Sequence, residues 1–137
     1  DLMLADAKVG GVLAEARWHG DVLDWVVVGV GINVRNALPV GLPFPVTSLA
    51  CHGVTLSPDQ LAGPVAESVA RATEEAPPLT PGELGAFRLR DWLDGRLLAL
   101  PHRGVARGIT AGGRLQILTP EGALLETSGT VQLGRAE

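Results

Sequence analysis

The stretch that decides the fold is Lys8–Asn33, which reads KVGGVLAEARWHGDVLDWVVVGVGIN. It contains two apolar runs rich in Val, Leu and Ile, and neither run has the 3.6-residue period of a helix. We therefore predict that they form two strands of one buried sheet. Between them lies Gly20-Asp21, a dipeptide suited to a two-residue hairpin turn.

This turn predicts a pairing that gathers glycines on one face. It would place Lys8 opposite Asn33, Gly10 opposite Gly31, and Val12 opposite Gly29, because side chains directly opposite each other share a face. The other face would then be core and carry Val9, Leu13, Val28, Val30 and Ile32. Glycine weakens a strand, so the patch indicates that something approaches the backbone closely. Two occupants stay open: a flat, partly anionic ligand beside the lysine, or a helix or second sheet. A slip of one residue would reverse the faces.

Length and composition bound the class of protein. The 137 residues allow one domain, or one domain and a small second one, and a hydrophobic fraction of 46% is enough for a core. A net charge of −4 argues against a broad nucleic-acid surface. No run is long enough to span a membrane, and no signal peptide is visible. The single Cys51 is typical of a reducing cytoplasm, and the three scattered histidines predict no structural zinc.

The two ends of the chain read differently from its middle. Asp1 is followed at once by the apolar Leu2-Met3-Leu4, which indicates a chain that begins inside a strand, hence a fragment or a clipped product. A turn at Ala5-Asp6-Ala7 would make a three-stranded meander. From Arg96 onward we expect five short strands separated by turns, at 96–100, 104–109, 114–119, 124–127 and 130–133.

Helices are predicted between these β regions. A Pro- and Gly-rich loop covers 34–57, and loops of that length are often functional. Ser57 with Pro58 begins a helix over 59–75, and Thr80 with Pro81 and Glu83 begins another that reaches about Trp92. The composition changes near Gly95, so we predict a first domain at 1–94 and an SH3-like barrel at 95–137. The fold class is α+β, with a mixed or antiparallel sheet in the first domain.

Common catalytic motifs are missing. Gly29-Val30-Gly31 is not a dinucleotide fingerprint, because a third glycine and a following helix are lacking, and no P-loop occurs. Cys51 and His52 are chain neighbours, which rarely face one another as a nucleophile and its base. Lys8 is costly at the mouth of an apolar strand unless it meets an anion or reaches water.

The chain as a whole resembles the C-terminal half of biotin–protein ligases, the enzymes that attach biotin to a carboxylase lysine. Asp1-Leu2 resembles the end of that family's Lys-Trp-Pro-Asn-Asp-Leu motif. The runs at 8–15 and 28–34 resemble its Lys-x-x-Gly-Ile-Leu-x-Glu and Ile-Gly-x-Gly-Ile-Asn strands. Thr47-Ser48-Leu49, the run 93–98 and the run 104–109 resemble later segments, so the likeness covers nearly the whole chain in order.

The resemblance implies a two-step reaction, biotinyl-5'-AMP formation from biotin and ATP, then transfer of biotin to a lysine of a biotin carboxyl-carrier protein domain. It implies that Lys8 and Asp1 are catalytic, with Lys8 at the carboxylate–phosphate junction and Asp1 near Mg²⁺ and the incoming lysine. It implies that Lys8, Gly11, Val12, Gly29 and Gly31 contact biotin, and that Asn33, Gly31 and Lys8 contact ATP or the adenylate. Mg²⁺ would be bound to ATP. A cytoplasmic location is expected, with no membrane or nucleic-acid partner; a homodimer stays open.

The sequence also departs from the family. The Gly-Arg-rich loop that clamps biotin and the start of the Lys-Trp-Pro-Asn-Asp-Leu motif are absent. We therefore expect these 137 residues alone to be inactive or nearly so, and poorly stable. The alternative function is a non-catalytic ligand- or protein-binding remnant. A nucleic-acid-binding SH3-like protein is a third option, which the acidic charge disfavours.

Overall fold

The computed structural model describes residues 1–74 and 78–134, which form two compact units divided after residue 74. Each unit contains one antiparallel sheet, and the chain also has two α-helices. The predicted α+β class is therefore confirmed. The two units divide after residue 74, which is twenty residues before the domain boundary that the composition predicts after residue 94. The helix after residue 80 therefore belongs with the second unit.

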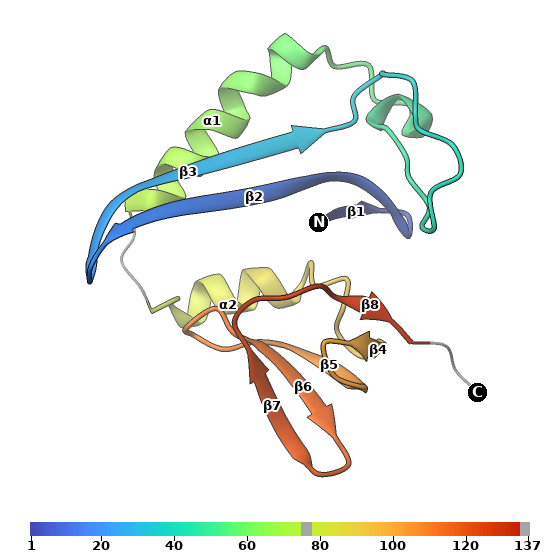
Figure 1. Cartoon of the computed structure of the whole chain (residues 1–137). Coiled ribbons are helices and arrows are strands. Elements are labelled where there is room, and N and C mark those ends of the chain that lie inside the picture. Colours follow the sequence, from blue (N-terminus) through green and yellow to red (C-terminus); the bar gives the residue numbers. More distant parts are fainter. Residues whose placement is uncertain (75–77, 135–137) are drawn as a thin grey trace. The chain divides into compact units, whose positions relative to one another are not determined.

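The first unit is built on a three-stranded sheet (Figure 1), with β1 at Leu2–Leu4, β2 at Ala7–His19 and β3 at Val22–Ile32. The predicted meander is confirmed. Its first turn is formed by Ala5 and Asp6, with φ of 48° and 61°, and its second by Gly20 and Asp21, with φ of 59° at Gly20. Positive φ values at the centre of a two-residue hairpin match the right-handed twist of the strands.

The long loop after β3 contains one short 3₁₀ helix, η1 at Leu49–His52, and leads to α1 at Pro58–Glu74. The Ser57 main-chain N–H donates to Gln60 Oε1 at 2.8 Å, and Gln60 N donates to Ser57 Oγ at 3.3 Å. This reciprocal pair satisfies helix-end donors and begins α1 where the sequence predicts. Leu61, Val65 and Val69 form the half-buried stripe of the helix.

The second unit begins with α2 at Pro81–Arg88, which ends four residues before the predicted end at Trp92. Thr80 and Glu83 form a full capping box. Five strands follow, paired in the order β7-β6-β5-β4-β8. Their bounds are β4 Leu97–Leu100, β5 Gly104–Ile109, β6 Leu115–Thr119, β7 Gly122–Glu126 and β8 Gln132–Leu133. The pairing places β7 and β8 at opposite ends of the sheet, so closure into an SH3-like barrel stays a prediction.

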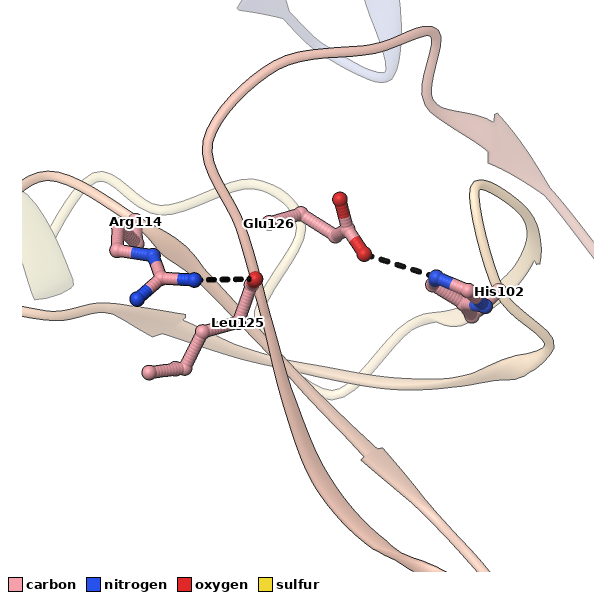
Figure 2. A network of polar contacts seen from close by, with 4 residues as sticks. All are labelled: His102, Arg114, Leu125 and Glu126. Atoms are coloured by element: carbon pink, nitrogen blue, oxygen red, sulfur yellow. Dashed lines mark hydrogen bonds and ion pairs between the residues drawn. The ribbon is translucent and has the colours of Figure 1, made fainter.

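Packing and polar contacts hold this second unit together. Leu98, Ala106 and Ile117 are fully buried, and Leu93 and Leu115 pack against them. Figure 2 shows the polar contacts of β7: the His102 ring lies 2.8 Å from the Glu126 carboxylate, and Arg114 donates to the Leu125 carbonyl at 2.9 Å. These contacts tie the β4–β5 turn and the start of β6 to β7.

The core of the first unit is small. Val9 and Val34 are buried, but Leu13 is 65% exposed and Trp18 60%. Val28, Val30 and Ile32 are half-buried. The prediction of a buried sheet is therefore wrong for the outer part of the hairpin, because residues 12–27 are exposed, whereas four of the five residues predicted for the core face are buried or half-buried. No helix in the described ranges is long and apolar enough to cross a membrane.

Candidate functional site

The β2–β3 register decides which glycines meet, and it differs from the predicted one. Close to the turn, His19 pairs with Val22 and Trp18 with Leu23, as the two-residue turn requires. The next pair is Arg17 with Trp25, so Asp24 is an extra residue on β3, a β-bulge. Beyond this bulge every pair is displaced by one residue.

The displaced register exchanges residues between the two faces of β2. Gly11, not Gly10, pairs with Gly31, and Leu13, not Val12, pairs with Gly29. The predicted pairs Gly10–Gly31 and Val12–Gly29 are therefore wrong, as is the placement of Leu13 among the core residues. The physical reason is that one inserted residue reverses the alternation of all side chains beyond it. The resemblance implies a ligand contact at Gly11. The register of the simple turn would have placed Gly11 on the face opposite to Gly29 and Gly31, but the observed register pairs it with Gly31.

The glycines in the two strands of the hairpin differ in what an added side chain would meet. A Cβ at Gly10 would overlap the carbonyl oxygen of Gly31, so backbone packing alone requires glycine there. A Cβ at Gly31 would meet nothing within 4 Å, and one at Gly29 would meet the Leu13 oxygen at 3.8 Å, both judged against residues 1–74 and 78–134. Within the first unit, neither a helix nor a second sheet covers that part of the glycine face. The space above Gly29 and Gly31 is open to a ligand.

Lys8 lies at the edge of this glycine face. Its Nζ is 2.6 Å from Asp1 Oδ1, and the two side chains are 33% and 60% exposed. A Cβ at Gly11 would lie 3.5 Å from that carboxylate oxygen and 3.9 Å from Lys8 Nζ. The ion pair therefore sits directly beside the glycine strand. Of the eleven basic residues in the chain, ten are arginines and Lys8 is the single lysine.

Asn33 closes the loop that follows β3. Its amide Nδ2 donates to the Thr47 carbonyl at 3.1 Å, and its Oδ1 accepts from Asn36 at 3.2 Å. Its main-chain N–H donates to Val9 at 2.7 Å. An asparagine amide has two donors and two acceptor lone pairs, so these side-chain bonds to described residues leave one N–H and one lone pair unused. Asn33 thus has a structural task as well as a place in the site.

Two adjoining open pockets flank Lys8. The loop pocket, about 610 Å³, is lined by Lys8, Gly10, Gly11, Gly31, Ile32, Asn33, Asn36, Pro39, Leu42, Phe44 and Val46. The strand pocket, about 500 Å³, is lined by Asp1, Lys8, Gly11, Val12, Leu13, Gly29, Val30 and Gly31. The two share Lys8, Gly11 and Gly31. All seven residues that the sequence analysis names for the site line one pocket or both.

Comparison with known proteins identifies the fold of this chain. No family model and no curated protein matches the sequence. Solved structures do match: the apo biotin protein ligase of Aquifex aeolicus, 23% identical, covers 96% of this chain with a TM-score of 0.68. The chain has the fold of the C-terminal part of a biotin protein ligase. A second structure of that ligase is 24% identical over 94% of the chain, with a TM-score of 0.68.

A third structure shows the Aquifex aeolicus biotin protein ligase in complex with biotin and ATP. It is 24% identical and covers 97% of this chain, with a TM-score of 0.66. The chain spans 61%, 60% and 58% of the length of these three biotin protein ligase structures. At this identity the likeness concerns the fold, and the activity is a separate question.

The structure adds one group of residues to the candidate site that the sequence analysis did not single out. Pro39, Leu42 and Phe44 of the loop after β3 form a wall of the loop pocket. Leu42 and Phe44 are each more than two-fifths exposed. The signal in the sequence was apolar residues alternating with prolines at 42–45 in a loop, where a buried core position is not expected.

The neighbours Cys51 and His52 do not form a pair. Ser48 Oγ donates to Cys51 Sγ at 3.2 Å, while the His52 ring lies 2.9 Å from the Thr47 hydroxyl. The Ser48 hydroxyl and main chain lower the pKa of the Cys51 thiol, because hydrogen bonds to sulfur favour the thiolate. Cys51 is exposed. Within the described part of the chain, no group of three or more His, Cys, Asp or Glu could hold a metal ion.

Proposed function

We propose that this chain carries one side of the biotinyl-adenylate site of a biotin–protein ligase. The observation that carries the proposal is the open glycine face beside a fixed cation. Gly29 and Gly31 have free space above them, and Lys8 lies at the edge of that space, shared by two pockets. The fold shared with a ligase whose structure is a complex with biotin and ATP supports the same interpretation.

In the proposed first step, a carboxylate oxygen of biotin attacks the α-phosphorus of ATP. The bond to the β-phosphate breaks, and biotinyl-5'-AMP and pyrophosphate form. Negative charge grows on the phosphate oxygens, and Lys8 stabilises that charge more in the transition state than before it. Biotin would lie over Gly11, Val12, Gly29 and Gly31, and the adenylate beside Gly31 and Asn33.

In the proposed second step, an acceptor lysine attacks the acyl carbon of biotinyl-5'-AMP. An amide forms, AMP leaves, and the amine loses a proton. The acceptor would be a biotin carboxyl-carrier protein domain. This is the step in which Asp1 is proposed to orient the incoming amine, and its ion pair with Lys8 places the carboxylate at the mouth of the strand pocket.

Mg²⁺ fits this proposal as an ion that would enter bound to the phosphates of ATP. The two pockets offer the single carboxylate of Asp1 among their described lining residues, and Mg²⁺ is commonly held by phosphates with one or two carboxylates. When bound, the ion would neutralise phosphate charge. Asp1 would hold it only by sharing or releasing Lys8, and no other residue of these pockets replaces that ligand.

A binding experiment tests the proposed site without requiring turnover. Calorimetric titration of the 137-residue chain with biotinyl-5'-AMP is expected to show binding, and Lys8→Ala is expected to weaken it about tenfold or more, as loss of a charge-assisted contact does. Arg71→Ala is the matched control, because it removes one positive charge from α1, which lines neither pocket. No binding by the wild-type chain would refute the proposal.

One observation favours the alternative of a non-catalytic binding remnant. The hairpin side chains Leu13, Trp18, Val22 and Val27 are more than half exposed, so the described residues enclose the glycine face from one side alone. Biotin-dependent exchange of pyrophosphate into ATP separates the two functions. We expect little exchange from these 137 residues; binding without exchange supports the remnant, and strong exchange supports a working ligase.

A further inference from the structure

The loop after β3 is fastened to the main chain on both sides of Lys8. Lys8 N donates to the Pro45 carbonyl at 2.9 Å, and Thr47 N donates to the Lys8 carbonyl at 2.9 Å. These bonds make the parallel bridge between Lys8 and Val46. The loop therefore returns to Lys8 after the strand has ended, and the position of Phe44 is set by its neighbour Pro45.

The Phe44 ring faces the Lys8 ammonium. Nζ lies 5.7 Å from the ring centroid, within the range in which an ammonium is attracted to the face of an aromatic ring. The ring also lines the loop pocket and is 45% exposed, so core burial does not explain it. Pro43 and Pro45 flank Phe44. Their fixed φ angles restrict the backbone on both sides of Phe44 and so reduce the number of positions that its ring can take.

A lysine needs such a partner more than an arginine would. Its ammonium is a compact charge on a flexible four-carbon stem, and each rotatable bond lets the charge leave the site. Asp1 holds Nζ at 2.6 Å from the strand-pocket side, and the Phe44 ring approaches from the loop-pocket side. Together they restrict the ammonium to the boundary shared by the two pockets.

We propose that Phe44 is a positioning residue, whose ring holds the Lys8 ammonium at this boundary so that it meets an anionic group of the ligand. The identity of the ligand rests on the proposed function, but the contact between Phe44 and Lys8 is present without any ligand. A cation held in place before binding loses less entropy when the anion arrives, which increases affinity and rate. The gain expected from a half-exposed contact of this kind is about two- to fivefold.

The single lysine makes the contact directly measurable. Reductive methylation with ¹³C-labelled formaldehyde labels Lys8 and the terminal amine of the chain and preserves the positive charge; the Lys8→Arg variant identifies the Lys8 signal by its loss. A group above a ring face is shielded, so the wild-type signal is expected upfield of the same signal in Phe44→Leu. Phe44→Trp is expected to keep the upfield position. Phe87→Leu, which changes the other phenylalanine of the chain, is the matched control and is expected to leave the signal unchanged.

The same signal then reports anion binding during a titration with inorganic pyrophosphate. Phe44→Leu is expected to weaken binding about two- to fivefold, and Phe44→Trp to restore it. An unchanged signal in Phe44→Leu would overturn the contact, and equal affinities in all three proteins would overturn the positioning role. If the wild-type chain binds no pyrophosphate although its signal is upfield, the anion site of the proposed function is wrong, and the role given to Phe44 falls with it.

Discussion

Gly10→Ala and Gly31→Ala are the same chemical change at two positions of one hairpin, and the structure predicts opposite effects. At Gly10 the new methyl group would overlap the Gly31 carbonyl oxygen and lie 3.2 Å from Ile32 Cα. Both neighbours are backbone atoms, so the strands themselves must move. At Gly31 the new methyl group would meet nothing within 4 Å among the described residues.

The magnitudes follow from these contacts. Overpacking against a fixed backbone costs about 1–3 kcal/mol, so Gly10→Ala is expected to lower the free energy of unfolding by that amount. For a unit of this size about 1 kcal/mol corresponds to roughly 4–8 °C in Tm. Gly31→Ala is expected to change stability by less than about 1 kcal/mol, in the stabilising direction, because alanine restricts the unfolded chain.

For ligand binding, the larger effect is expected at Gly31, the position where stability changes least. The Gly31 methyl group would occupy the space proposed for the ligand, so Gly31→Ala is expected to weaken biotinyl-5'-AMP binding about tenfold or more. The assays are urea unfolding followed by tryptophan fluorescence, and calorimetric titration of the folded variant. A stable Gly31→Ala protein that binds as tightly as the wild type would remove this glycine from the ligand floor. An undisturbed stability in Gly10→Ala would show that the displaced register is wrong.

Three further predictions concern other parts of the chain. In a complete ligase containing this segment, Lys8→Ala is expected to slow adenylation by on the order of 10²–10³, as measured by pyrophosphate exchange, and an unchanged rate would remove its catalytic role. Ser48→Ala removes the hydroxyl hydrogen bond that is the main cause of the lowered pKa of Cys51, so the pH profile of alkylation by iodoacetamide should move to higher pH; a profile that stays in place would contradict this cause. Thr80→Ala removes the side-chain acceptor of the Glu83 N–H and should lower the stability of the second unit by about 1 kcal/mol in urea unfolding; full stability would show that the capping box adds nothing.

The local features of the fold were predictable because short segments determine them. Gly20-Asp21 makes the hairpin turn, Ser57 and Thr80 cap the two helices, and the strand Gly104–Ile109 appears with its predicted bounds. Each depends on residues within four or five positions of one another. The end of α2 is predicted four residues too late, at Trp92 instead of Arg88, because the apolar spacing continues beyond the last helical residue.

Residues that line the two pockets could be named from the sequence, but the geometry of the pockets could not be predicted. Sequence alone placed a lysine and glycines at the mouth of one hairpin, and the resemblance to a ligase family named Asp1 and Gly11 as well. The bulge at Asp24 could not be read from the pattern, because it depends on how two strands fit side by side over their whole length. Tertiary structure also decided that the loop returns to Lys8 and sets Phe44 over its ammonium, since those contacts join residues more than thirty positions apart that no local preference connects.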